Sequence, residues 1–208
     1  MCQLQNMFSR FLKATLYVLL CSMLWACHQP DTTILPPDVQ LQAGDIVFRQ
    51  GESIESEAVL AADRSGCYSH IGIVVDSCGQ PMIVHAVPGE PDYEGDPDRV
   101  KMDRPEVFFY RSRALIGEVM RCNDTGKAEF AAQTALHLYK KGVLFDHDYN
   151  DNDSTEMYCT ELVDFAYRSA GLHLATGPRK KFSFPFDFYG YLPSAIHASP
   201  LLVSVRCF

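Results

Sequence analysis

The stretch that decides the fold is EMYCTELVDFAY, residues 156–167, which is followed shortly by Gly171. Its apolar residues recur at i, i+3, i+4, i+7 and i+11, the spacing of one face of an α-helix. These residues are Cys159, Leu162, Val163, Ala166 and Ala170. Asp153 and Glu156 form a capping-box-like start, and a glycine is typical just past a helix end. We therefore predict a helix whose apolar face packs into the protein.

Cys159 lies near the amino end of this predicted helix, on its inward face. Unpaired backbone N–H groups and the helix macrodipole favour a thiolate at such a position. A buried core cysteine is the alternative interpretation, because free cysteine is among the most buried residue types. The helix alone leaves both interpretations open.

The composition is that of one ordinary globular domain. The chain has 208 residues, of which 47% are hydrophobic and 21% are charged. The formal net charge of −8 gives no indication of nucleic-acid binding, because that function rests on clustered Lys and Arg. We interpret the one basic cluster, residues 179–181, as a solvated loop.

The first 26 residues have the pattern of a targeting segment. Arg10 and Lys13 accompany a short apolar run, residues 14–26, which is shorter than the ~20 residues of a membrane-spanning helix. The run ends in LWAC, residues 24–27, which resembles a bacterial lipoprotein signal. The resemblance implies cleavage before Cys27, a lipid on Cys27, and a protein anchored to a cell-envelope membrane on the periplasmic or outer-membrane side. An ordinary signal peptide cut nearby is the alternative.

We divide the chain into a signal peptide (residues 1–26), a lipidated cysteine with a tether (residues 27–42) and a catalytic domain (residues 43–208). Three prolines and little periodicity indicate the tether, and an ordered arm packed on the domain is the alternative. An exported compartment permits disulfides. If Cys159 is free, three pairings of the remaining cysteines stay open. These are Cys67, Cys78, Cys122 and Cys207.

Two predicted strands form a hairpin that carries two histidines. Residues 68–76 are rich in β-branched side chains, and residues 82–87 return after a turn. His70 lies near the start of the first strand and His85 lies on the second, so their rings could be neighbours. Thiol catalysis needs a thiolate, an imidazole that exchanges a proton with it, and a polar group that orients the imidazole. Cys159, on a helix that crosses this sheet, would complete a Cys–His–His set.

Three sheet segments and the Cys159 helix together resemble a known enzyme family. LQAGDIVF (residues 41–48), HIGIVV (residues 70–75) and VHA (residues 84–86) are similar to the sheet of the NlpC-type papain-like cysteine amidases and peptidases. In that family the cysteine helix comes before the sheet, whereas here YCTELV, residues 158–163, comes after it. This order resembles the circularly permuted, YiiX-like branch, which has lecithin–retinol acyltransferase-like enzymes as distant relatives. The resemblance implies a permuted papain-like α+β fold, with an antiparallel sheet or small barrel packed against the cysteine helix.

The same resemblance implies a role for each matching residue. Cys159 would be the nucleophile, His70 its general base and acid, and His85 the group that orients His70. The oxyanion would be bound by the Cys159 backbone N–H and a side-chain donor, for which Tyr68 and Tyr158 are the nearest candidates in sequence. No cofactor and no metal are implied.

These roles predict a cysteine hydrolase that cleaves an amide or ester bond through a thioester on Cys159. A cell-wall peptide or a lipid-like acyl compound would be the substrate. An acyltransferase and a non-catalytic lipid- or peptide-binding protein on the same scaffold are alternatives. A zinc module formed by Cys67, His70, His85 and Cys159 is weighed as well, although these residues lack the usual ligand spacing.

Overall fold

The computed structural model describes residues 31–152, 154–183 and 187–208. The predicted signal peptide, Cys27 and Asp153 therefore lie outside the described residues. The part of the chain from residue 32 onward forms one compact unit. Within the described residues, no helix has both the length and the apolar character needed to cross a membrane.

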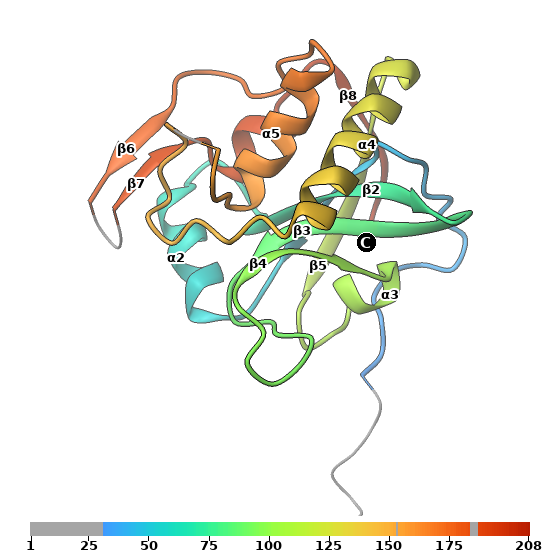
Figure 1. Cartoon of the computed structure of the whole chain (residues 1–208), viewed down its shortest axis with the longest axis horizontal. Coiled ribbons are helices and arrows are strands. Elements are labelled where there is room, and N and C mark those ends of the chain that lie inside the picture. Colours follow the sequence, from blue (N-terminus) through green and yellow to red (C-terminus); the bar gives the residue numbers. More distant parts are fainter. Residues whose placement is uncertain (1–30, 153, 184–186) are drawn as a thin grey trace, which may run out of the picture. The chain divides into compact units, whose positions relative to one another are not determined.

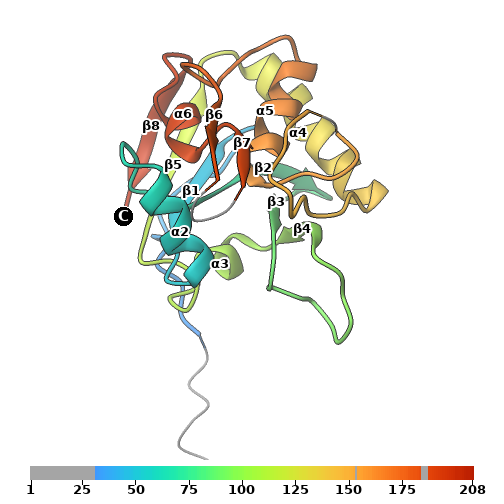
Figure 2. The same ribbon diagram turned by 90° about the vertical axis from the view of Figure 1, so that its left-hand side faces the viewer.

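The unit is built on a six-stranded antiparallel sheet with the order β4-β3-β2-β1-β5-β8 (Figures 1 and 2). The strands are β1 (Ile46–Gln50), β2 (His70–Ser77), β3 (Gln80–Val87), β4 (Arg99–Asp103), β5 (Ile116–Cys122) and β8 (Leu202–Cys207). The predicted hairpin is present as β2 and β3, with Ile73 opposite Val84. The sheet is open, with β4 and β8 at its edges, so the predicted mixed α+β class with an antiparallel sheet is confirmed.

Two helices cover one face of the sheet. They are α4 (Thr125–Lys141) and α5 (Cys159–Ser169), which pack on each other and on β2 (Figure 1). Strand β2 presents Ile71, Ile73 and Val75 to the main core on this side. Helix α5 contributes Leu162 and Val163 to the same core, as the helical periodicity predicts.

The opposite face of the sheet holds a smaller core and a stripe of polar residues. Short helix α3 (Pro105–Phe108) closes this face, where Val47 and Val74 join Phe108 in the core. Because side chains alternate along a strand, His70 and Gly72 share this face with Val74. On β1, Arg49 lies directly opposite His70. The polar stripe therefore lies on the face away from α4.

The Gly44–Asp45 turn lets α4 approach the start of β1. Gly44 has a φ of +88°, and a Cβ there would lie 2.5 Å from atoms of Ala128 on α4. The buried Asp45 carboxylate accepts hydrogen bonds from the backbone N–H of Gln42 and from the Arg121 guanidinium. The turn therefore has a structural role.

Residues 32–41, which belong to the predicted tether, pack along the domain. Thr33 forms a β-bridge with Tyr110, and the Ile34 N–H donates to the Phe109 carbonyl. Leu35 and Val39 pack against the smaller core. This is the ordered-arm arrangement for the described part of the segment.

The remaining elements lie around the amino ends of α5 and β2. Helix α2 (Ile54–Ala62) follows β1 and has no buried residue. A hairpin of β6 (Lys180–Phe182) and β7 (Phe188–Gly190) follows α5, and α6 (Pro193–His197) leads into β8.

Candidate active site

Cys159 is the first residue of helix α5, not a residue inside its first turns. The predicted capping-box start at Asp153 and Glu156 is wrong, because Glu156 forms a parallel β-bridge with Leu144 and Tyr158 is the N-cap. The Tyr158 side chain makes no capping hydrogen bond. The first N–H groups of the helix therefore lie beside the half-buried sulfur of Cys159, where they can donate hydrogen bonds to a negatively charged group.

His70, His85 and Asp103 form a buried chain of hydrogen bonds. Nε2 of His70 lies 2.9 Å from Nδ1 of His85, and Nε2 of His85 lies 3.2 Å from Oδ2 of Asp103. A carboxylate only accepts hydrogen bonds, so Nε2 of His85 carries the proton and Nδ1 of His85 is the acceptor. Nε2 of His70 must then donate, and the lone pair of His70 is on Nδ1.

The pKa values of the three groups support this proton arrangement. Burial alone would raise the pKa of the Asp103 carboxyl, but His85, Lys101 and Arg113 together hold it well below its usual range. Burial lowers the pKa of His85 more than Asp103 raises it. Burial and the Arg49 charge also lower the pKa of His70 well below its usual range. Both rings are therefore neutral at pH 7, beside an ionised carboxylate.

Packing fixes the two rings in place. The ring of His70 lies 5.6 Å from that of Phe108, and the ring of His85 meets Phe108 edge-on at 5.1 Å. Gly72 leaves the room that His85 needs, because a Cβ at Gly72 would lie 2.7 Å from Cγ2 of Ile83 and 3.2 Å from Cβ of His85.

A buried ion-pair network surrounds the chain of hydrogen bonds. Asp103 pairs with Arg113 at 3.1 Å and with Lys101 at 3.5 Å. Glu90 bridges Arg113 and Arg49, and Arg49 also donates to the Phe108 carbonyl at 2.8 Å. Ionised partners surround each buried charge, which is the condition for charges to be tolerated in an interior.

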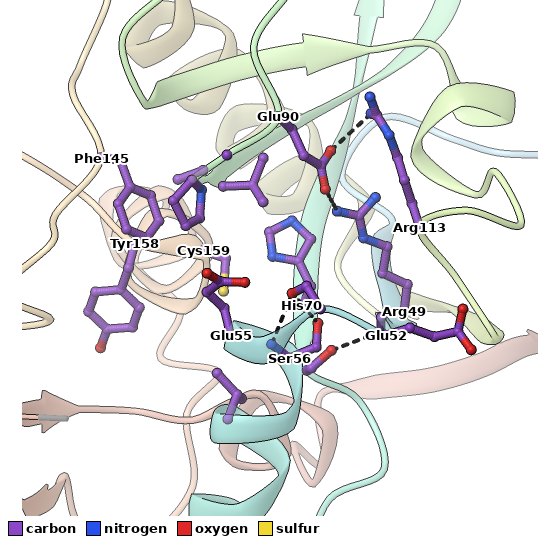
Figure 3. A pocket seen from close by; sticks show the side chains of 18 of the residues that line it. Arg49, Glu52, Glu55, Ser56, His70, Glu90, Arg113, Phe145, Tyr158 and Cys159 are labelled. Carbon is purple, nitrogen blue, oxygen red and sulfur yellow. Dashed lines mark hydrogen bonds and ion pairs between the residues drawn. The ribbon is translucent and has the colours of Figure 1, made fainter. Parts of the chain in front are cut away.

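Cys159 and His70 open into one cavity of about 360 Å³ (Figure 3). Its walls come from the start of α2, the ends of β1 and β3, the loop after β3, and the segment before α5. Phe145, Tyr149 and Tyr158 supply aromatic surface, whereas His85 and Asp103 lie behind His70 and do not line the cavity. Among the described residues, no hydrogen bond joins the Cys159 sulfur to His70, so the two groups face the same space without a direct bond.

Burial raises the pKa of the Cys159 thiol, although several groups favour the thiolate. These groups are the backbone of Ile71, the Thr160 hydroxyl, and the backbone of Thr160 and of Cys159 itself. The prediction that the helix end would yield a thiolate is therefore only partly met, because burial outweighs the local dipoles. The raised pKa of Cys159 and the lowered pKa of His70 both favour a neutral thiol beside a neutral imidazole at pH 7.

Neither predicted tyrosine offers its hydroxyl to the cavity. The Tyr68 hydroxyl donates to Glu118 at 2.8 Å, and Tyr68 does not line the cavity, so it is removed as a candidate oxyanion donor. The Tyr158 ring lines the cavity, but its hydroxyl accepts from the Tyr191 N–H at 3.1 Å and points away from Cys159 (Figure 3). The hydroxyl of Tyr158 is therefore also removed.

Tyr149 is a residue that sequence reasoning missed. It lines the cavity, and burial together with the Cys159 charge raises its pKa to about 12. Its φ of +48° is left-handed, which is uncommon for an aromatic residue and often marks functional sites. No sequence signal marks it, because DHDYNDN, residues 146–152, reads as a polar loop.

Asp146 has a structural role, and Cys67, weighed as a zinc ligand, lies apart from the cavity. Asp146 accepts from the backbone N–H groups of Asp148 and Asn150, so it shapes the loop that carries Tyr149. The exposed Cys67 does not line the cavity. All five cysteines in the described residues are free thiols, and no group of three or more His, Cys, Asp or Glu side chains there is arranged to hold a metal ion.

Comparisons with known proteins give one structural likeness. No protein-family model matches the sequence, and no curated protein matches it. Among solved structures, the chain is similar to the crystal structure of the metalloprotein YiiX from Escherichia coli O157:H7, with 22% sequence identity and a TM-score of 0.65. The similarity covers 81% of this chain and 98% of that chain. The two proteins therefore share their fold, a mixed α+β arrangement around an antiparallel sheet.

Proposed function

We propose that this protein is a cysteine hydrolase with a circularly permuted papain-like fold, which cleaves an amide or ester bond through a thioester on Cys159. The observation that carries the proposal is the chain Asp103–His85–His70, which leaves the lone pair of His70 on Nδ1 in a ring that lines the same cavity as Cys159. A thiol and an oriented imidazole in one cavity are the requirements of nucleophilic catalysis.

The first half of the reaction forms the thioester. Nδ1 of His70 takes the thiol proton as the sulfur attacks the carbonyl carbon, and the carbonyl oxygen becomes an oxyanion. The backbone N–H groups of Cys159 and Thr160 lie at the free helix end, and with the Tyr149 hydroxyl they form the oxyanion site. The tetrahedral intermediate then breaks its bond to the leaving amine or alcohol, which receives the proton from His70.

The second half returns the free thiol. A water molecule gives a proton to Nδ1 of His70 and attacks the thioester carbon. The carbon–sulfur bond breaks, the acid leaves, and the sulfur regains the proton from His70. Asp103 stays ionised throughout and stabilises the positive charge that His70 and His85 share in each transition state.

The order of elements supports the permuted arrangement. The strands that carry His70 and His85 come before the helix that carries Cys159, which is the order that the sequence resemblance implies. The cell-envelope location and the lipid on Cys27 belong to the same proposal, and they favour a cell-wall peptide or a lipid-like acyl compound as substrate.

A metal-dependent function is a competing hypothesis, because the similar YiiX structure is described as a metalloprotein. The donor set in this chain does not fit a metal. Both ring nitrogens of His85 are used, on His70 and on Asp103, so His70 keeps only Nδ1 for a ligand, and Cys67 is exposed outside the cavity. The four residues weighed as zinc ligands, Cys67, His70, His85 and Cys159, therefore do not converge on one point. We assign no catalytic step to a metal.

Acyl transfer and binding without turnover are two more functions that the same scaffold could support. Acyl transfer would use the same thioester and replace water by another acceptor. Binding without turnover would leave the buried chain behind His70 without a purpose, although buried charges of this kind cost stability. This cost favours an enzyme.

The experiment is labelling with an electrophilic acyl probe, followed by mass spectrometry of the intact protein and its peptides. We expect an adduct on Cys159 that forms faster than any adduct on an exposed cysteine, and no adduct at position 159 in Cys159→Ala. Cys78→Ser is the matched control, because Cys78 is exposed in the β2–β3 turn and should not affect labelling. A folded wild-type protein that gives no adduct on Cys159 would refute the proposal.

A further inference from the structure

One wall of the cavity carries two arginines beside His70. Arg49 is on β1 directly opposite His70, and Arg113 lies in the loop before β5. Figure 3 shows the Glu90 carboxylate between the two guanidinium groups. Two cations at the reacting end of a cavity, in a protein with a net charge of −8, need an explanation beyond solvation.

The two arginines have more donors than the structure uses. Arg113 uses only Nη1, which contacts Asp103 and Glu90, so its Nε and Nη2 have no partner among the described residues. Its side chain is 25% exposed and lines the cavity. The Nε of Arg49 is also without a partner, although that side chain is 4% exposed. A buried donor without a partner costs free energy unless a ligand satisfies it.

Glu90 can give way without a movement of its loop. The Lys101 ammonium holds the backbone carbonyl of Glu90 at 2.7 Å, so the main chain at this point is anchored. Rotation of the Glu90 side chain alone would release Nη2 of Arg49 and the shared contact on Arg113. The Glu90 carboxylate therefore already occupies the donors that face each other on the two arginines.

We propose that Arg113 and Arg49 form a subsite for a carboxylate on the acyl part of the substrate, close to the bond that Cys159 attacks. A guanidinium presents a flat fork of N–H groups that matches a carboxylate in two parallel hydrogen bonds. The ligand binds the free edge of Arg113 first and displaces Glu90 to reach Arg49. This subsite rests on the proposed function only in using Cys159 as the neighbouring reactive group.

The test compares two alkylating reagents of similar size, one charged and one neutral. Iodoacetate carries a carboxylate and iodoacetamide does not, so the ratio of their rates at Cys159 reports attraction of the carboxylate. The exposed Cys78 in the same sample gives the reference ratio by peptide mass spectrometry. Because both reagents need the same thiolate, a change in thiol acidity cancels in the ratio.

We expect Arg113→Gln to lower this ratio about tenfold, which corresponds to ~1.4 kcal/mol and is within the range of one charge-assisted hydrogen bond. Arg113→Lys should give an intermediate ratio, because it keeps the charge and loses the fork. Glu90→Gln should raise the ratio, because it frees the inner donors. Arg111→Gln is the matched control in the same loop, since Arg111 is exposed and does not line the cavity. Equal ratios in Arg113→Gln and Arg111→Gln would overturn the subsite.

The outcomes separate this inference from the proposed function. If iodoacetamide alkylates Cys159 and only the ratio fails to respond, the hydrolase proposal survives and the subsite falls.

A thermal-shift measurement with succinate needs no reactive thiol. Succinate should raise the melting temperature of Glu90→Gln more than that of Glu90→Gln with Arg113→Gln. No difference between them, or a larger shift with inorganic phosphate than with succinate, would overturn the assignment to a carboxylate.

Discussion

Nε2 of His70 lies 2.9 Å from Nδ1 of His85, and this contact decides which nitrogen of His70 can act as a base. The Asp103 carboxylate accepts from the far side of the His85 ring, so both rings are held in one tautomer. Nδ1 of His70 therefore carries a lone pair and no proton. A hydrogen-bond acceptor at position 85 is therefore needed for His70 to accept the proton of Cys159.

Two substitutions at His85 test this role. His85→Leu fills much of the space but offers no acceptor, so His70 can adopt the wrong tautomer, and kcat should fall by about 10²-fold or more. His85→Gln keeps a carbonyl oxygen that can accept from Nε2 of His70, so it should recover a large part of that loss. Turnover of an ester substrate and alkylation of Cys159 give the comparison. Equal activity in the two variants would show that the acceptor at position 85 does not matter.

Gly72 should be intolerant of even one methyl group. A Cβ there would lie 2.7 Å from Ile83 and 3.2 Å from His85, so Gly72→Ala should cost about 1–3 kcal/mol of stability and shift the His85 ring. Denaturant unfolding and turnover measure the two effects. Gly126→Ala on α4 is the matched control, because its nearest neighbouring atom would be 3.8 Å away and alanine favours a helix. A stable, fully active Gly72→Ala protein would contradict the packing argument.

The sequence predicted the frame of the site because its signals are local. The β-branched runs of β2 and β3 and the period of α5 are visible in the order of residues alone, and they located His70, His85 and Cys159. The start of α5 was misplaced for a tertiary reason. The Met157 N–H donates to the Leu144 carbonyl, so this part of the chain pairs with another segment and Glu156 cannot lie in the first turn of the helix.

The missed residues act across strands or from loops. Asp103 reaches His85 only because β4 pairs with β3 in one register, which places Lys101 opposite His85. In the sequence it is one of several charged residues in VKMDRPE, residues 100–106. Lys101 and Asp103 are two positions apart, so on a strand they share one face, and both are buried in the structure. This spacing of two charged residues is the one sequence signal that could have indicated an inward polar face. Arg113 and Tyr149 lie in loops, where no periodicity reports direction.

Tyr149 should contribute through its hydroxyl alone. Tyr149→Phe keeps the ring that packs on Phe145 and Tyr158, but it removes a donor from the oxyanion site, so kcat should fall by about 10²-fold with little change in KM. Tyr158→Phe is the control, because its hydroxyl accepts from Tyr191 and points away from Cys159. It should lose stability and keep kcat. The reverse pattern would return the oxyanion role to Tyr158.

The alkylation rate of Cys159 should rise with pH without a plateau near neutrality. Burial raises the pKa of Cys159 above its ordinary value of 9.0, and burial with the Arg49 charge lowers the pKa of His70 below 6.5. Little thiolate is therefore present at pH 7, and the rate with iodoacetamide should climb through pH 9. A rate that is already constant between pH 6 and 8 would instead show a preformed thiolate–imidazolium pair.

Folding stability should fall as the pH drops below about 6.5, the ordinary pKa of an unfolded histidine. His70 and His85 have lowered pKa values in the folded protein, so below that pH the unfolded chain binds protons that the folded chain does not. Stability is then complete above pH 6.5 and is lost toward lower pH, at up to ~1.4 kcal/mol per pH unit for each group. His85→Leu removes one of the two groups, so the slope of unfolding free energy against pH between 6.5 and 5 should be about half that of the wild type. Urea unfolding at several pH values measures both slopes, and identical slopes would mean that His85 is protonated in the folded protein and that the tautomer assignment behind the mechanism is wrong.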